Sequence, residues 1–272
     1  MAVKLKGAVV CITGAGRGIG AATAKAFAKA GSRVVIGDID LTAAQQVAAE
    51  IGPLATAVKL DVADIASFTQ FIEAAREIGP VDVLVNNAGI QRTGVFTEQA
   101  LEAQLREIAI NLGGVLTGMR LVLPEMLARN TGHIVNVSSM AGKISVPGCA
   151  VYTASKFGVA SLSRAVRAEI DGSKVTITTV LPAAVQTELT AGLNIRGVPK
   201  SKPETIAKEI VASCKHGRPE VTMPKWLGQI GTLEQALPER VGDFVKKVVG
   251  AQSRMTADNA NSRAYQDRVS RS

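Results

Sequence analysis

The chain is poor in cysteine, histidine and aromatic residues. Its 272 residues include three cysteines and two histidines, and aromatic residues make up 3%. Cys11, Cys149 and Cys214 show neither the spacing of a zinc or redox motif nor a grouping with His133 and His216, so we expect no bound metal. The low, odd cysteine count argues against a secreted fold held by disulfides, and it favours a cytoplasmic protein.

Long apolar runs are also missing. No stretch approaches the ~20 apolar residues that a membrane-spanning helix needs. Residues 1–7 are short and mixed and lead directly into a strand pattern, so we expect no signal peptide. The formal net charge is +8, but the basic residues are dispersed and aromatic residues for base stacking are scarce, so we expect no nucleic-acid partner. An anionic substrate or carrier remains compatible with this charge.

Small and branched apolar residues are abundant instead, and they occur in alternating segments. Short runs rich in Val, Ile and Leu, without polar alternation, predict strands covered on both faces. They lie at residues 8–13, 33–37, 55–60, 81–86, 133–138 and 175–181, with a seventh at 220–223. Helical patterns fall between them, at 19–30, 42–51, 65–78, 98–129, 152–171 and 203–216. This order predicts one α/β domain with a doubly wound parallel sheet of about seven strands and helices on both faces.

The pattern changes toward the end of the chain. The single domain is predicted to cover residues 1–250, with a candidate substrate lid at 188–202 and short amphipathic helices at 224–250. The apolar residues expected on one side of these helices are Trp226, Leu227, Ile230, Leu233 and Leu237. Trp226 is expected to cover the substrate pocket, contact a neighbouring subunit or pack in the core. Residues 251–272 are polar and predict a flexible tail or an arm on a partner subunit.

A glycine-rich segment, residues 13–20, joins the first strand to the first helix. Glycines let the backbone approach phosphate oxygens closely, and the following helix end offers free N–H groups and the positive end of its dipole. An ordinary strand-to-helix turn is the alternative, but the strand–turn–helix context near the start of the chain favours a dinucleotide site. The candidate cofactor-binding residues here are Gly14, Gly16, Arg17, Gly18, Ile19 and Gly20.

An acidic residue ends the second strand. Asp38 lies 20 residues after Gly18, where a carboxylate can accept hydrogen bonds from the ribose hydroxyls of adenosine. The same charge would repel a 2′-phosphate, which favours NAD over NADP. Arg17 leaves NADP open, because a cation near the ribose tolerates the extra phosphate. Asp40, before Leu41, is an alternative residue for capping the next helix.

With further motifs downstream, the chain resembles the short-chain dehydrogenase/reductase family in its shorter-subunit form. The resemblance rests on motifs spread over residues 8 to about 190, in the family's order and spacing. They are Thr13-Gly14-x-x-x-Gly18-x-Gly20, Asn86-Asn87-Ala88-Gly89, Asn111, Ser138-Ser139 and Tyr152-x-x-x-Lys156. It implies a Rossmann-type fold and a nicotinamide-dependent oxidoreductase that interconverts an alcohol and a ketone.

The resemblance also implies further contacts with the cofactor. The residues concerned flank the adenine, line the cleft or hold the nicotinamide end. They are Ile19, Asp61, Val62, Asn87, Ala88, Gly89, Tyr152, Lys156, Pro182, Val185 and Thr187. One departure is Ala183, where the family has glycine after Pro182, and its methyl group would reshape the nicotinamide end.

Four residues are the predicted catalytic set. Tyr152 would act as general acid or base, and Lys156, four residues later on the same helical face, would lower the phenol pKa together with the charge of the oxidised nicotinamide. The resemblance makes Ser139 the residue that orients the substrate oxygen. It makes Asn111 the residue that bends or hydrates the long helix and holds a proton-relaying water. Taken singly, Ser139 would be a turn hydroxyl and Asn111 a polar group between helices, but the joint pattern favours catalysis.

The substrate side is predicted to be mostly apolar, which favours a lipophilic alcohol or ketone. The residues expected to line it are Ser139, Met140, Ile144, Val146, Cys149, Leu189, Leu193 and Ile195. By resemblance we expect a homotetramer, with a dimer next. Two other functions stay open: an NADPH-linked reductase of carrier-bound 3-oxoacyl chains, and a cofactor-binding sensor without turnover.

Overall fold

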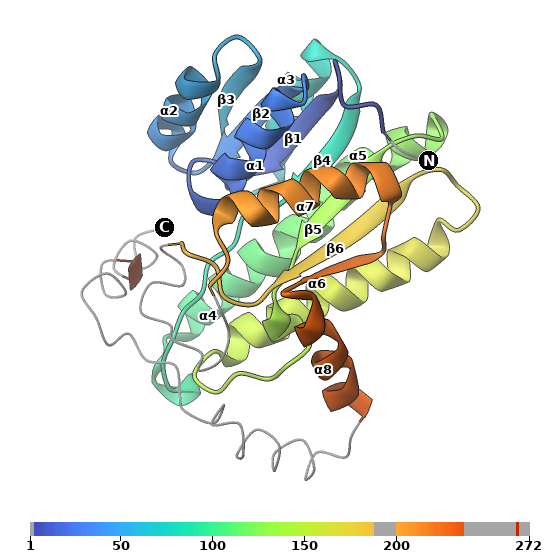
Figure 1. Ribbon diagram of the computed structural model, residues 1–272. Helices are drawn as coiled ribbons and strands as arrows, with labels where there is room; N and C mark the ends of the chain where they lie inside the picture. Colours follow the sequence, from blue (N-terminus) through green and yellow to red (C-terminus); the bar gives the residue numbers. More distant parts are fainter. Residues whose placement is uncertain (1–2, 188–199, 237–264, 267–272) are drawn as a thin grey trace.

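Parallel strands form the centre of the protein, as the sequence predicts. The computed structural model describes residues 3–187, 200–236 and 265–266. Within them the sheet has the order β3-β2-β1-β4-β5-β6-β7, and all its pairs are parallel (Figure 1). The order reverses between β1 and β4, which is where ligands bind in such sheets. The strands are β1 (Val9–Thr13), β2 (Arg33–Asp38), β3 (Ala55–Lys59), β4 (Val81–Asn86), β5 (His133–Val137), β6 (Thr176–Pro182) and β7 (Glu220–Met223).

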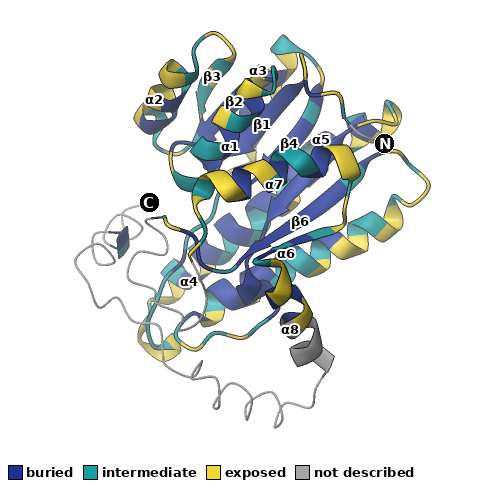
Figure 2. Ribbon diagram, in the orientation of Figure 1, coloured by how far each residue is buried: buried dark blue, intermediate teal, exposed yellow. Residues whose placement is uncertain are grey.

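Helices cover both faces of this sheet. α1, α2 and α7 pack on one face, and α3, α5 and α6 on the other. The strands between them are buried almost throughout, except the edge strand β3, in which no residue is fully buried (Figure 2). The helices are α1 (Gly18–Lys29), α2 (Leu41–Ile51), α3 (Ile65–Ile78), α4 (Leu101–Ile108), α5 (Gly114–Ala128), α6 (Ala150–Glu169), α7 (Pro203–His216) and α8 (Lys225–Ala236).

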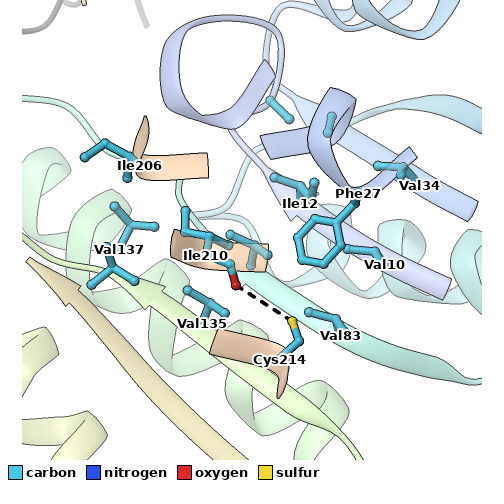
Figure 3. Packing of buried hydrophobic residues seen from close by; sticks show 14 of the residues in the cluster. Val10, Ile12, Phe27, Val34, Val83, Val135, Val137, Ile206, Ile210 and Cys214 are labelled. Carbon is cyan, nitrogen blue, oxygen red and sulfur yellow. Dashed lines mark hydrogen bonds between the residues drawn. The ribbon is translucent and has the colours of Figure 1, made fainter. Parts of the chain in front are cut away.

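The two hydrophobic clusters explain the uninterrupted apolar runs of the strands. In β1, Val10 and Ile12 point to the face of α1 and α7, where Phe27 packs against them (Figure 3). Val9 and Cys11 point to the opposite face and join the cluster under α3, α5 and α6. Cys11 is thus a buried small apolar residue.

Local chemistry sets where several helices begin and end. Asp40 accepts a hydrogen bond from the backbone N–H of Ala43 at the start of α2, as the sequence allows. Asp64 caps α3 in the same way. At the C-terminal end of α7, Gly217 adopts a left-handed φ of 57°, a conformation that favours glycine.

The predicted helix over residues 98–129 is wrong as one continuous α-helix. The structure has a 3-10 turn at Phe96–Glu98, then α4, a π-helical turn η2 (Ala109–Gly113), and α5. The π-turn adds a residue to the helical register at Asn111, whose side chain is drawn to the backbone of Ile90. Hydrophobic periodicity alone does not detect this widening.

The C-terminal part is described only in pieces. In α8, Leu227 is buried against Met140 and Leu181, whereas the side chain of Trp226 is 48% exposed. The expectation that these two neighbours share one side is therefore wrong, because consecutive helical residues point about 100° apart. Most of the predicted lid at 188–202 and of the tail at 251–272 lies outside the described residues. None of the helices that the structure describes is long and apolar enough to cross a membrane.

Candidate active site

The glycine-rich loop between β1 and α1 packs backbone against backbone. Gly14 has a φ of 62°, and a Cβ there would come 2.7 Å from the Cα of Ala88. A Cβ on Gly20 would come 2.2 Å from the carbonyl oxygen of Gly14. The start of α1 has no side-chain cap and no acidic residue in its first turn, so its N–H groups and positive dipole end stay available to an anion. These features fit a dinucleotide diphosphate.

A threonine ties this loop to the segment after β4. The hydroxyl of Thr13 accepts hydrogen bonds from the backbone N–H groups of Asn87 and Ala88, both at 3.0 Å. The amide of Asn87 donates to the carbonyl oxygens of Thr13 and Gly14, both at 2.9 Å. The Asn87-Ala88-Gly89 segment therefore lies beside the glycine loop, where the resemblance predicts one wall of the cofactor cleft.

Asp38 stands at the end of β2, against the glycine loop. One carboxylate oxygen accepts from the backbone N–H of Gly16 at 2.8 Å and the other from that of Asp40 at 3.0 Å. Arg17 lies nearby but forms an ion pair with Asp40 at 2.5 Å. The Arg17 hydrogen bond, followed by the one from Ala43, lowers the pKa of Asp40. The negative charge of Asp38 thus faces the glycine loop, and the Arg17 cation is paired with Asp40.

The two residues expected beside the adenine are held differently. The Asp61 carboxylate accepts from the Arg106 guanidinium at 2.7 Å and from the backbone N–H of Ala63 at 3.0 Å. Val62 is buried, and a Cβ on Gly114 would come 2.9 Å from its side chain. Arg106, which was not predicted as a site residue, fixes the position of Asp61.

Tyr152 and Lys156 lie on one face of α6, one turn apart. Their side chains are buried, with 8% and 4% of the residue exposed. The Lys156 ammonium lies 5.6 Å from the centre of the Tyr152 ring and donates to the carbonyl oxygen of Val137 at 3.0 Å. Because Val137 ends β5, the lysine joins α6 to the strand that leads to Ser139.

Ser139 begins a 3-10 turn, η3 (Met140–Gly142), just after β5. Its hydroxyl accepts from the backbone N–H of Ala141 at 3.1 Å and donates to the carbonyl oxygen of Pro182 at 3.4 Å. Ser139 also forms a hydrogen bond with Tyr152 that acts to lower the phenol pKa. The structure thus brings together the serine and the tyrosine of the predicted catalytic set.

Asn111 is fully buried in the π-turn and clamps the segment after β4. Its amide nitrogen donates to the carbonyl oxygen of Ile90, and its oxygen accepts from the N–H of the same residue, both at 2.8 Å. The amide nitrogen also reaches the Ser155 hydroxyl at 3.1 Å. A Cβ on Gly89 would lie 3.1 Å from the Asn111 oxygen and 3.3 Å from the Lys156 nitrogen. Glycine at position 89 therefore keeps space open beside both groups.

Burial sets the ionisation of the pair in the cofactor-free protein. Burial raises the pKa of Tyr152 above its ordinary value and outweighs the Ser139 hydrogen bond. Burial also lowers the pKa of Lys156 to about 8, against the opposing charge of Glu107. The predicted lowering of the phenol pKa also requires the charge of the oxidised nicotinamide, so it stays a prediction. In the cofactor-free protein, desolvation disfavours both charged forms.

The predicted substrate residues divide into two groups. Val146 and Cys149 pack with Tyr152, so they lie beside the phenol. Met140 and Ile144 belong to a separate cluster with Leu227. The residues Leu189, Leu193 and Ile195 lie outside the described residues.

The segment after β6 returns to the cofactor side. A Cβ on Gly18 would lie 3.3 Å from the Thr187 methyl group, so Thr187 stands beside the glycine loop. Val185 is buried and bridges to Ser201. Pro182 accepts from Ser139, and Ala183 packs partly buried near Met140. Ile19 is partly buried against the cluster of α1.

Three residues near the site were not predicted. Glu107 is buried in α4 and acts on the charge of Lys156. Gln91 donates to the Cys149 sulfur at 3.1 Å, and its backbone N–H donates to the Tyr265 hydroxyl at 3.0 Å. Glu107 lies four residues before Asn111, a helical spacing that could have indicated its position. Nothing in the local sequence indicates Tyr265, because its contact joins residues 174 positions apart.

Across residues 3–187, 200–236 and 265–266, no group of three or more His, Cys, Asp or Glu side chains could hold a metal ion.

Known proteins of one family are similar to this chain. The family model described as short chain dehydrogenase matches residues 8–196. The chain is 37% identical over 236 residues to "Probable oxidoreductase EphD" of Mycobacterium tuberculosis, covering 78% of this chain and 40% of that protein. The chain thus spans well under half the length of EphD.

Two further relatives are covered more fully. The chain is 38% identical over 197 residues to the 2,5-dichloro-2,5-cyclohexadiene-1,4-diol dehydrogenase LinX of Sphingobium indicum, covering 71% of this chain and 79% of LinX. Among solved structures it is similar to a 3-ketoacyl-(acyl-carrier-protein) reductase of Brucella melitensis complexed with NADH. That likeness has a TM-score of 0.75 and 33% identity, and covers 80% of this chain and 98% of the other.

Proposed function

Since this chain belongs to the short-chain dehydrogenase family and is an oxidoreductase of that family, we propose that it transfers a hydride between NAD and a lipophilic secondary alcohol or its ketone. One observation carries the proposal: Tyr152 and Lys156 are buried together on α6, with Ser139 and Asn111 around them and Gly89 open beside the lysine. When bound, the nicotinamide supplies or accepts the hydride.

The chain's own residues handle the proton. Tyr152 takes the hydroxyl proton during alcohol oxidation and returns it during ketone reduction. Ser139 hydrogen-bonds the phenol and orients the substrate oxygen toward it. Lys156, held on the carbonyl oxygen of Val137, supplies positive charge beside the phenol, and Asn111 keeps the segment after β4 in place.

NAD is the proposed cofactor. The glycine loop and the uncapped start of α1 fit the diphosphate, whichever cofactor binds. Asp38 supports NAD, because its carboxylate faces the loop and would repel a 2′-phosphate. Arg17 forms an ion pair with Asp40, which argues against Arg17 as a ligand of a 2′-phosphate. The NADH complex of the Brucella reductase agrees with this choice.

A lipophilic substrate fits the residues around the phenol. Val146 and Cys149 pack against Tyr152, so an apolar group of the substrate would meet apolar surface there. A second candidate is reduction of a carrier-bound 3-oxoacyl chain. The net charge of +8, which would attract an acidic carrier, and the likeness to the Brucella carrier-protein reductase favour it.

We also propose a homotetramer, with a dimer as the alternative, in the cytoplasm. Four leucines of α4 and α5 are exposed, namely Leu101, Leu105, Leu116 and Leu127. Such an apolar surface is typical of an interface between subunits. The three free cysteines are all buried, which fits a reducing compartment. The assembly is tested by measuring the molar mass of Leu116→Glu by light scattering. Ile65→Glu makes the same kind of change at an exposed residue of α3 and is the control. Only Leu116→Glu should dissociate.

The function is tested by a substrate screen with both cofactors. Purified protein is offered aliphatic and cyclic secondary alcohols, ketones and 3-oxoacyl thioesters with NAD(H) or NADP(H), and nicotinamide absorbance is followed. We expect turnover of apolar alcohols with NAD and its loss in Tyr152→Phe by about a thousandfold or more. A Tyr152→Phe variant as active as the parent would overturn the mechanism, and cofactor binding without any turnover would favour a sensor.

A further inference from the structure

Glu107 is a buried acid that the proposed mechanism does not use. It lies in α4 with none of its surface exposed. One carboxylate oxygen accepts from the backbone N–H of Arg92 at 3.2 Å. The other oxygen has no hydrogen-bond partner within the part of the chain that the structure describes. A buried carboxyl group with an unpaired oxygen is costly, so its presence beside the site calls for a reason.

Glu107 and Asn111 hold the same segment of backbone. Asn111 grips Ile90 through both its N–H and its carbonyl oxygen, and Glu107 accepts from Arg92 two residues later. Gly89, which begins this segment, lies against Lys156. The acid is therefore fixed, by helix and by backbone, on the side of the site where the lysine stands.

Lys156 needs a negative charge nearby. Its ammonium is buried, and its hydrogen bond goes to a neutral carbonyl group, that of Val137. Burial disfavours the charged form and brings the lysine pKa to about 8, and Glu107 is the group that acts in the opposite direction. In return Lys156 acts to lower the pKa of Glu107, which burial raises to about 7. Each group thus favours the charged form of the other.

We propose that Glu107 is the counter-ion that keeps Lys156 protonated inside the site. Glu107 is then a positioning residue, since it acts on the reaction only through the lysine. The inference rests on the proposed function, because a charged Lys156 matters only if Tyr152 exchanges the substrate proton.

The charged and titratable groups around Glu107 come from two neighbouring elements. Arg92 follows β4 and acts on Glu107 together with Lys156. The charge of Glu107 acts to raise the pKa of Tyr152 and of Cys149, at the start of α6, because it disfavours their anions. An ionised Glu107 therefore favours the ammonium of Lys156 and disfavours the phenolate of Tyr152. Removing its charge should lower the pKa of both groups, which disfavours the ammonium and favours the phenolate.

The experiment is an NMR titration of the lysine side-chain signals in cofactor-free protein, with the Lys156 signal identified by its absence from Lys156→Met. Glu107→Gln removes the charge but keeps an oxygen that can accept from Arg92. Glu102→Gln makes the same change on the exposed surface of α4 and is the matched control. We expect the Lys156 midpoint to fall by about one pH unit in Glu107→Gln, because one negative charge is lost, and to stay in place in Glu102→Gln.

Activity gives a second reading. With its midpoint lowered by about one unit, Lys156 would be charged about tenfold less often near pH 9 and almost as often near pH 6. Glu107→Gln should therefore lose about tenfold of kcat/KM near pH 9 and little near pH 6, whereas a packing defect would lower activity at both. Glu107→Asp keeps the charge and should keep the midpoint within a few tenths of a unit.

The outcomes are separable. An unmoved Lys156 midpoint in folded Glu107→Gln, or an equal shift in Glu102→Gln, overturns the counter-ion whatever the enzyme catalyses. If Glu107→Gln does not fold, Glu107→Asp, which keeps the charge, takes its place. A Lys156 midpoint that falls by about one pH unit in Glu107→Asp would also overturn the counter-ion. A fully active Tyr152→Phe would instead remove the proposed function on which the inference rests.

Discussion

His133 should make the protein sensitive to acid. Its imidazole, in β5, is fully buried. Nδ1 lies 2.7 Å from the Thr176 hydroxyl and Nε2 lies 2.9 Å from the Ser213 hydroxyl. Burial, with a smaller contribution from His216, lowers the pKa of His133 to about 4. The ring therefore stays neutral in the folded protein down to acidic pH.

The sign and size of the effect follow from proton linkage. In the unfolded chain the imidazole takes up a proton at its ordinary pKa of 6.5, but in the folded protein only at about 4. The stability contributed by the neutral ring is thus complete above the unfolded pKa and is lost as the pH falls through the folded one. A difference of about 2.5 pKa units corresponds to ~3 kcal/mol, a large share of the stability of a typical domain.

Urea unfolding at a series of pH values measures this loss. The free energy of unfolding of the parent minus that of His133→Gln should shrink by about 3 kcal/mol between about pH 7 and about pH 4. His216→Gln, which removes the exposed imidazole of the chain's second histidine, is the control, and its difference should change less, because His216 makes only the smaller contribution to the pKa of His133. A parent-minus-variant difference that stays constant over this range for His133→Gln would refute the reasoning.

Three further predictions concern packing, cofactor choice and the end of the chain. Gly118→Ala should lower the free energy of unfolding by about 1–3 kcal/mol in urea, because its Cβ would come 2.4 Å from the amide oxygen of Asn86; an unchanged midpoint would contradict the tight contact. Asp38→Ala should shift the NADH to NADPH preference about tenfold toward NADPH in kcat/KM, and an unshifted ratio would remove Asp38 as the selective residue. Tyr265→Phe should lower the free energy of unfolding by about 1 kcal/mol in urea through the lost hydrogen bond to Gln91, and no loss would show that this contact contributes nothing.

The sheet could be predicted from the sequence because its central strands are buried on both faces. The run from Val9 to Ile12 in β1 contains no polar residue, and a helix pattern separates most runs from the next. The predicted strands match the observed ones to within two residues at either end. Hydrophobic periodicity did not predict the π-turn at Ala109–Gly113, because it does not detect the two hydrogen bonds between Asn111 and Ile90, 21 positions away.

The candidate site could be predicted only in part. Motif spacing brings Ser139, Tyr152 and Lys156 into one neighbourhood, and the structure agrees. Their ionisation could not be predicted in the same way, because desolvation depends on how completely the neighbouring elements cover them. Glu107 shows the same limit, since an acid in a helical pattern is usually solvent-exposed.

The alignment of β4 and β5 is fixed by a short polar chain through the core. Asn86 and Asn136 are partners in the strand register, and their side-chain amides are joined at 2.8 Å. Asn136 also donates to the Ser163 hydroxyl of α6 at 2.9 Å. Valine and isoleucine alone would tolerate a slipped sheet, but a shift by one residue would bury both amides without these partners. This polar chain therefore holds the register of the two strands, so that Asn87-Ala88-Gly89 after β4 and Ser138-Ser139 after β5 leave the sheet at the same edge.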